Sequence, residues 1–166
     1  MKAKLLRSFL PIALIFTLVS CTSDNAEDLS SSDNQLVQEY DYNETELQLA
    51  RLINDYRESK GLQKLEVINH ISYKSEEHNE YMIANNVVNH DYFQQRSQNI
   101  IHVLGAVKVN ENVAYNYITP EAALHAWLNS PGHKANIEGD FSSFGISVKV
   151  NPENGKKYYT NIFMKK

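Results

Sequence analysis

Apolar positions recur at helical spacing in four stretches of the chain, and the first stretch has the clearest boundaries. It begins at Asn43-Glu44-Thr45-Glu46, a capping box in which the first and fourth side chains satisfy free backbone N–H groups. Its apolar stripe has charged residues on the opposite face and consists of Leu49, Leu52, Ile53 and Tyr56. Gly61 is the predicted stop of this helix.

The same periodicity predicts three further helices. One covers residues 69–85, and its narrow, partly polar stripe indicates close packing against a neighbour; the stripe consists of Ile71, Ser75, His78 and Met82. The next covers 93–105 and ends at a glycine. The last begins at Thr119, which is followed by a proline and an acidic residue, and Pro131 is expected to close it.

The remaining patterned segments alternate with the period of a strand. Residues 107–115 are predicted to form one strand, and 144–150 and 158–162 to form a C-terminal hairpin around Asn154-Gly155, which supplies the positive φ of a tight turn. Helices first, strands interleaved and a hairpin last predict an α+β fold in which helices pack on an antiparallel sheet. A three-layer α-β-α arrangement is one form of this architecture.

The first twenty residues have the composition of an export signal. Three basic residues precede an apolar run over 9–19, which is too short to span a bilayer as a permanent helix. The run ends at Leu18-Val19-Ser20-Cys21, which resembles the bacterial lipobox, where cleavage precedes a cysteine that is then acylated. We therefore predict a lipoprotein signal peptide at 1–20, a lipidated Cys21 and a place in the cell envelope, on the outer membrane. An ordinary signal with an incidental cysteine is the alternative.

Charge divides the mature chain into a tether and a domain. The signal holds three of the 16 Lys and Arg and none of the 20 Asp and Glu, so the mature chain has a net charge of −7. Residues 22–43 hold six acids, no base and little apolar surface, so 21–43 is interpreted as the lipidated cysteine and a flexible acidic tether. The domain at 44–166 has a net charge of −1 and no basic stripe, which argues against a nucleic-acid partner.

Cysteine usage and motif content exclude several kinds of catalysis. Cys21 is the only cysteine, so the chain has no internal disulfide, and an acylated thiol cannot act as a nucleophile. The chain also lacks Gly-x-Ser-x-Gly, His-Glu-x-x-His and a phosphate-binding loop. No common hydrolase motif therefore identifies an activity.

The six histidines differ in their predicted surroundings. His70 is expected at the surface, and His78, on a helical stripe, is expected to be a hydrogen-bonded core residue. Two others lie beside apolar stripes and are expected to be exposed, namely His102 and His125. His90 and His133 fall in segments rich in turn residues, where binding groups concentrate.

Glu111 is the third candidate site residue. Asn110-Glu111-Asn112 interrupts an otherwise apolar strand, so this carboxylate either faces solvent or points into a cleft. Spacing does not decide between the two, because His90, Glu111 and His133 are far apart in the sequence and form no local motif.

Five segments occur in an order that is typical of one family: Arg51-Leu-Ile-Asn54, Gly61-Leu-Gln-Lys-Leu65, Asn89-His90-Asp91, Asn110-Glu111-Asn112-Val113-Ala114 and Ala126-Trp127-Leu-Asn-Ser-Pro-Gly-His133-Lys-Ala-Asn-Ile137. With the closing strands Phe144-Gly145-Ile146 and Tyr158-Tyr159-Thr160, they resemble the bacterial branch of the CAP (SCP-like) superfamily. The resemblance covers essentially all of residues 44–166.

The resemblance implies a three-layer α-β-α sandwich, with a central, mostly antiparallel sheet and a cleft. Larger members of the family line this cleft with two histidines and two acids, and some bind a divalent cation there. The matching residues here are His90, Glu111 and His133, while Ser130 occupies the position of the second acid. We therefore expect at most a weakly bound divalent cation (zinc, magnesium or calcium), and any catalysis to rest on the same three residues.

Three functions remain open at this level. The preferred one is a displayed binding or envelope module, anchored to the membrane, for an unknown small-molecule, peptide or envelope ligand. The second is a metal-assisted hydrolase, in which His90 and His133 are ligands or proton carriers and Glu111 is a ligand or base. The third is lipid binding, because some eukaryotic relatives bind sterols, although no apolar pocket-lining set is evident in the sequence.

Overall fold

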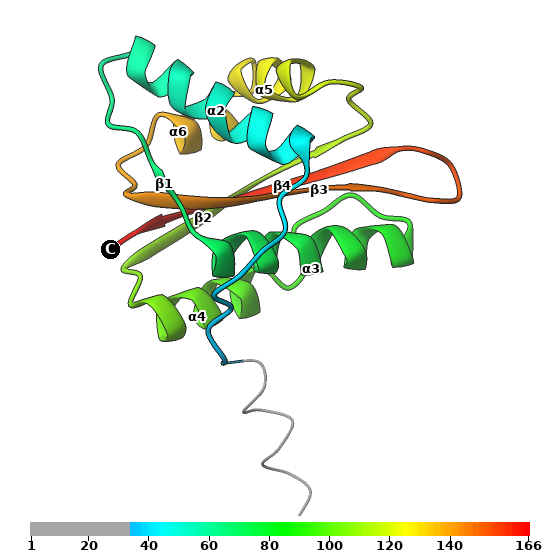
Figure 1. Cartoon of the computed structure of the whole chain (residues 1–166), viewed down its shortest axis with the longest axis horizontal. Coiled ribbons are helices and arrows are strands. Elements are labelled where there is room, and N and C mark those ends of the chain that lie inside the picture. The colour runs from blue at the N-terminus through cyan, green and yellow to red at the C-terminus, as the bar shows by residue number, and fades with distance from the viewer. Residues whose placement is uncertain (1–33) are drawn as a thin grey trace, which may run out of the picture.

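A four-stranded sheet with the strand order β1-β3-β4-β2 forms the middle layer of the molecule. The computed structural model describes residues 34–166. One face of the sheet is covered by α2 (Glu44–Ser59), α5 (Pro120–Leu128) and α6 (Pro131–Ile137) (Figure 1). The other face is covered by α3 (Asn69–Asn85) and α4 (Phe93–Leu104). The predicted α+β class and three-layer α-β-α sandwich are confirmed.

The sheet is mostly antiparallel, as predicted. Strand β4 (Lys157–Lys165) pairs antiparallel with both β2 (Lys108–Tyr115) and β3 (Ser143–Val150). The turn between β3 and β4 contains Gly155, with a φ of 70°. The sequence pattern missed β1 (Glu66–Val67), which pairs in parallel with the start of β3, because two residues are too few to show an alternation.

Local sequence signals set most helix boundaries where they were predicted. Asn43 and Glu46 form the capping box of α2, in which each side chain accepts the backbone N–H of the other residue. Thr119 caps α5 by accepting from the N–H of Ala122. The prediction for Pro131 was incomplete, since α5 ends at Leu128 and the proline begins a second short helix, α6. Proline suits this first helical position because its missing N–H would have no intrahelical partner.

The packing of α3 on β3 follows from its narrow stripe. The four stripe residues are all buried: Ile71, Ser75, His78 and Met82. At Gly145 in β3, any Cβ would collide with the α3 backbone at Ile71 and Ser72. Only glycine therefore permits this close approach of helix and strand.

Side chains from α2 and α3 close the outer edge of β3. The Ile146 N–H donates to Ser72 Oγ at 3.0 Å, and the Val148 N–H donates to Glu46 Oε1 at 2.8 Å. Asn43 Nδ2 donates to the Val148 carbonyl at 3.2 Å. Glu46 is 1% exposed, and burial raises the pKa of its carboxyl despite these hydrogen bonds. Both edge N–H groups are thus satisfied within the domain.

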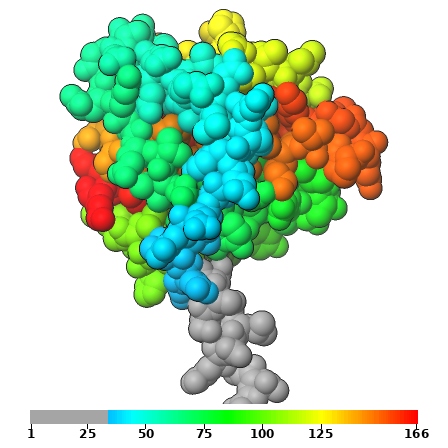
Figure 2. All heavy atoms as spheres, viewed as in Figure 1, coloured from blue at the N-terminus to red at the C-terminus, as the bar shows by residue number. Residues whose placement is uncertain are grey.

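The packed domain begins before residue 44. Residues 34–43 lie along the outside of α3 and lead into α2 (Figures 1 and 2). The Val37 N–H donates to His70 Nδ1 at 3.2 Å, and the Tyr40 hydroxyl donates to Glu46 at 3.1 Å. The Tyr42 hydroxyl lies 2.9 Å from Ser72 Oγ. The last part of the predicted 21–43 tether is therefore docked on the domain, because its tyrosines supply apolar surface and hydrogen bonds.

The signal at 1–20, Cys21 and the rest of the tether lie outside the described residues. Within the described part of the chain, no helix has the length and apolar character needed to cross a membrane.

Candidate functional site

Glu111 lies in the middle of β2, which runs unbroken from Lys108 to Tyr115. The strand predicted at 107–115 is therefore confirmed, and the polar segment around Glu111 interrupts only its apolar pattern. Strand alternation directs Glu111 to the α3–α4 layer, and Asn110 and Asn112 to the α6 layer. The Glu111 side chain is 1% exposed, and a carboxylate at this depth needs charged or hydrogen-bonding partners.

Arg96 is the partner that the sequence pattern did not reveal. Its Nε lies 3.0 Å from Glu111 Oε2, and its Nη2 lies 2.9 and 2.8 Å from Oε1 and Oε2. Its Nη1 donates to the Asp91 carbonyl at 2.7 Å. Arg96 lies four residues before the core residue Ile100 on α4, so an arginine on an apolar stripe was the available signal.

His90 contacts the same carboxylate from the loop between α3 and α4. Its Nδ1 lies 2.8 Å from Glu111 Oε1, and its side chain is 51% exposed. A carboxylate paired with a guanidinium is an acceptor, so Nδ1 donates and Nε2 carries the lone pair of the neutral ring. Asn89 shapes the loop, because its side chain accepts from the Asp91 N–H at 3.1 Å and donates to Asp91 Oδ2 at 2.8 Å.

His78 is the hydrogen-bonded core histidine that its position on α3 predicted. Its Nε2 donates to the Asn89 carbonyl at 2.9 Å and lies 3.8 Å from Glu111 Oε1. Burial lowers the pKa of His78 more than the charge of Glu111 raises it, so the ring is neutral at neutral pH. His78 therefore holds the loop that carries His90.

His133 lies on α6 and not in a loop, and asparagine side chains bind α6 to β2. Asn112 Nδ2 donates to the His133 carbonyl at 3.0 Å, and Asn136 Nδ2 donates to Asn112 Oδ1 at 2.8 Å. Burial lowers the pKa of His133, and the charge of His90 lowers it further. Among the described residues, the His133 ring makes no hydrogen bond to His90 or Glu111. His90 and Glu111 are thus in contact, whereas His133 lies on α6, in the layer opposite the Glu111 carboxylate, and is within electrostatic range of His90.

These residues do not fit a tightly bound metal ion. Arg96 holds both oxygens of Glu111, and His90 contacts one of them, so a cation would have to displace these partners. Within residues 34–166, no group of three His, Cys, Asp or Glu side chains is arranged to hold a metal ion. Ser130 offers only a hydroxyl where larger relatives are expected to have an acid.

A cavity of about 370 Å³ adjoins β2 on the side of α5 and α6. His133 and Ser130 are its polar lining residues; the others are Val88, Val113, Ala114, Tyr115, Tyr117, Ala126 and Trp127. The sequence had shown no apolar lining of this kind, because its members come from four separate segments. Trp127 is 1% exposed, and its Nε1 donates to the Val113 carbonyl at 3.0 Å.

On the outer edge of β2, the carbonyl groups of Glu111 and Val113 are hydrogen-bonded within the domain, and their N–H groups are not. The Asn116 N–H bonds to β4 at Lys157, so Glu111 and Val113 direct both their N–H and their C=O groups to the outer edge. Asn136 Nδ2 donates to the Glu111 carbonyl at 3.3 Å, and Trp127 caps the Val113 carbonyl. In the part of the chain that the structure describes, neither the Glu111 nor the Val113 N–H has a hydrogen-bond acceptor.

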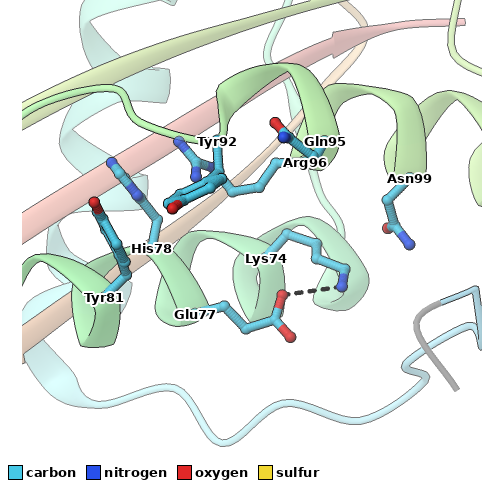
Figure 3. A pocket seen from close by; sticks show the side chains of 8 residues that line it. All are labelled: Lys74, Glu77, His78, Tyr81, Tyr92, Gln95, Arg96 and Asn99. Carbon is cyan, nitrogen blue, oxygen red and sulfur yellow. Dashed lines mark ion pairs between the residues drawn. The ribbon is translucent and has the colours of Figure 1, made fainter. Parts of the chain in front are cut away.

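A smaller hollow of about 200 Å³ lies between α3 and α4 (Figure 3). Figure 3 shows His78, Tyr81 and Tyr92 at one end and Lys74 extending toward the other, where it pairs with Glu77 at 2.9 Å. Arg96 also lines this hollow, so it lies between the hollow and Glu111.

The prediction for His70 was wrong, since this side chain is buried at 1% exposure. Its Nδ1 accepts from the Val37 N–H, and its Nε2 donates to Asn99 Oδ1 at 2.7 Å. Docking of residues 34–43 buries it, which helical periodicity cannot show. The two remaining histidines are exposed as predicted, namely His102 and His125.

Comparisons with known proteins agree with this architecture. The chain is 35% identical over 126 residues to the membrane protein YlbC of Bacillus subtilis, covering 74% of this chain and 35% of that protein. The chain thus spans about a third of this relative's length. An outer surface protein of Borrelia burgdorferi shares the fold with a TM-score of 0.68 and 22% identity, over 76% of this chain and 96% of that one.

An extracellular protein containing a SCP domain from Bacillus anthracis gives a TM-score of 0.65 and 27% identity, over 74% of this chain and 40% of that one. The model of the cysteine-rich secretory protein family, CAP, matches residues 50–163. This range contains His90, Glu111 and His133 and every strand of the sheet for most of its length. Because the match extends over more than half of the chain, this protein belongs to the CAP family.

Proposed function

We propose that this chain is a cell-envelope lipoprotein whose CAP domain binds a small-molecule or peptidic ligand at the outer edge of β2. The binding cleft is defined here by His90, Glu111, Val113, Ser130 and His133. One observation carries the proposal: the cavity beside β2 is lined by aliphatic and aromatic side chains together with an imidazole and a hydroxyl, from His133 and Ser130. Such a cavity with few convergent polar groups is the usual form of a small-ligand site.

The pairing of Glu111 favours binding over metal-assisted hydrolysis. A general base or a metal ligand needs a carboxylate that can exchange its partners. Arg96 instead holds Glu111 through both oxygens, at distances of 2.8 to 3.0 Å. In the proposed cleft this ion pair orients His90, whose Nε2 remains available to a ligand.

NMR titration of the unlipidated mature chain (residues 22–166) tests binding at the cleft. A panel of small organic acids, their amides and tripeptides is expected to contain compounds that saturably shift the backbone amides of Val113 and His133. Ala126→Trp should abolish these shifts by filling the cavity, because Ala126 lines it. His125→Trp is the matched control, since His125 is exposed on the same helix. Shifts that persist in Ala126→Trp would place binding elsewhere.

The lipid anchor at Cys21 is the second part of the proposal. It is supported by the signal and lipobox pattern, and by relatives described as a membrane protein, an outer surface protein and an extracellular protein. Cys21→Ala should block acylation and leave the protein unprocessed or in the soluble fraction. Membrane partition of a Cys21→Ala protein whose signal has been removed would contradict the anchor.

A further inference from the structure

At the outer edge of β2, the protein satisfies the hydrogen-bond acceptors and leaves the donors without a partner. Side-chain N–H groups of Asn136 and Trp127 satisfy the carbonyls of Glu111 and Val113. The N–H groups of the same two residues have no acceptor among residues 34–166. Glu111 and Val113 are 7% and 8% exposed as whole residues, and the Glu111 side chain is 1% exposed, so the exposed area of Glu111 lies on its backbone at this edge. The edge therefore lacks acceptors that a ligand is able to supply.

The side chains of Asn112, Glu111 and Ser130 do not supply these acceptors. Asn112 has both ends of its amide engaged, with its Nδ2 bonded to the His133 carbonyl and its Oδ1 to Asn136. The Glu111 carboxylate faces the opposite layer and is neutralised by Arg96. Ser130 makes no side-chain cap on α6, so its hydroxyl is a further donor beside the cavity. The N–H groups of Glu111 and Val113 and the Ser130 hydroxyl are thus three donors that lie together at the boundary between β2 and the cavity.

We propose that the cleft recognises a peptide-like carboxylate: an apolar residue with a free carboxylate and a preceding amide carbonyl. The carboxylate accepts from the Val113 N–H and from Ser130, and the carbonyl accepts from the Glu111 N–H. The apolar side chain enters the cavity beside Trp127. This inference deepens the proposed function and rests on it.

The geometry of a strand explains why two separate acceptors are required. Edge N–H groups two residues apart are separated by about 6.7 Å, which is far more than the spacing of the two oxygens of one carboxylate. In an extended acylated amino acid, the carboxylate and the acyl carbonyl are set apart along the chain and match this separation better. Charge adds to the preference, because hydrogen bonds to an ionised acceptor are stronger than those to a neutral one.

The test compares N-acetylphenylalanine with its neutral amide, N-acetylphenylalaninamide, by NMR titration of residues 22–166. The acid should bind roughly tenfold more tightly than the amide, because hydrogen bonds to an ionised acceptor are stronger than those to a neutral one. The Val113 and Glu111 amide protons are expected to move downfield together. 3-Phenylpropionate, which lacks the acyl carbonyl, should shift Val113 without Glu111.

The tripeptide Ala-Ala-Phe distinguishes two sources of the same chemistry. Binding as tight as that of N-acetylphenylalanine identifies the C-terminus of a peptide as the ligand, and weaker binding identifies a free acylated amino acid. Ser130→Glu should weaken binding of the acid at least tenfold more than binding of the amide, because only the acid is repelled by the new charge, with Ser130→Ala as the control for the lost hydroxyl.

The titrations distinguish failure of the acceptor inference from failure of the proposed function. Equal affinity for the acid and the amide, or cavity shifts without movement of the Val113 and Glu111 amides, would overturn the acceptor inference and leave the proposed function standing. The absence of any shift in cleft residues across the whole panel would overturn the proposed function itself.

Discussion

The outward backbone groups of the two strands β3 and β2 are hydrogen-bonded in different ways. At β3, oxygen atoms of Ser72 and Glu46 accept the outward N–H groups, and Asn43 donates to the Val148 carbonyl. At β2, only the carbonyls are covered, by Asn136 and Trp127. Both solutions prevent the open pairing by which a bare edge strand recruits other chains. Only the β2 solution leaves hydrogen-bonding capacity at a cavity.

The β3 edge belongs to the packed scaffold of the domain, whereas the β2 edge borders the candidate site. The oxygens that close β3 belong to α2 and α3, which pack on the sheet through fully buried side chains such as Ile53 and Ile71. The groups that cap β2 belong to α5 and α6, short helices that also border the 370 Å³ cavity. The paired N–H groups of Ile146 and Val148 fix one edge, and the N–H groups without an acceptor at the other mark the place where a ligand can bind.

Removing the cap of the Val113 carbonyl should have the largest effect. Trp127→Ala deletes a buried aromatic side chain, which typically costs about 3–5 kcal/mol, and we expect a protein that unfolds or aggregates readily. Trp127→Phe keeps most of the apolar bulk and loses the Nε1 donor, so a smaller loss of about 1–3 kcal/mol is expected. Urea unfolding measures both, and wild-type stability of Trp127→Ala would show that the indole is not part of the core.

Removing the cation that holds Glu111 should have a similar or slightly smaller effect. Arg96→Met leaves a buried carboxylate without its guanidinium, and breaking such a pair costs about 3–5 kcal/mol. Adding Glu111→Gln to Arg96→Met should restore part of this stability, because the uncompensated charge is gone. Arg51→Met, at an exposed position on α2, is the matched control and should stay within about 0.5 kcal/mol. Equal effects of the two arginine substitutions would refute the role of the pair.

Removing the acceptor at the β3 edge should reduce the stability of the fold by a smaller amount, and the contribution of this acceptor to stability should depend on pH. Glu46→Ala leaves the Val148 N–H without its acceptor, at a cost of about 1–3 kcal/mol. Burial raises the pKa of Glu46 above its ordinary value of 4.5, so the folded state binds this proton more tightly than the unfolded state. The resulting stabilisation is fully present below that ordinary value and is lost as the pH rises through the folded pKa. Relative to Glu46→Gln, the wild type should therefore lose stability as the pH rises, which thermal melts between pH 4 and 7 would detect or rule out.

Zinc titration gives the smallest expected effect and sharpens the description of the β2 edge. Affinity should be micromolar or weaker, lost in His133→Ala and improved by Ser130→Glu, which restores an acid at the position of the family's second carboxylate. Occupancy should fall as the pH drops below the histidine range, because a protonated imidazole cannot coordinate. Nanomolar binding that survives His133→Ala is incompatible with the ligand set His90, Glu111 and His133. Ser130→Glu is thus expected to favour a cation and to exclude a carboxylate.

Elements whose signals are local were predictable from the sequence. The capping box of Asn43 and Glu46, the start of α5 at Thr119 and the β3–β4 hairpin each depend on residues a few positions apart. The close packing of α3 was also predictable, because a stripe of small and polar residues allows a near approach to a strand. Family resemblance, and not spacing, was what joined His90 to Glu111.

Features that depend on distant segments were not predictable in this way. Arg96 and Glu111 belong to different elements, and periodicity does not state which buried charges meet. The burial of His70 depends on Val37, which lies in a segment whose acidic composition indicated a tether. The polarity of the β2 edge depends on Asn136 and Trp127, from two helices whose positions only the complete fold defines.

The docked segment 34–43 has a mechanical consequence. Its contacts with His70, Ser72 and Glu46 lie along α3 and the β3 edge, whereas the cleft lies at β2, on the far side of the sheet. Tension applied through the N-terminus therefore reaches these hydrogen bonds before it reaches the sheet. The β2 edge, which borders the cleft, is separated from this docked segment by β3 and β4 and makes none of these contacts, so pulling on the segment leaves the cleft unloaded.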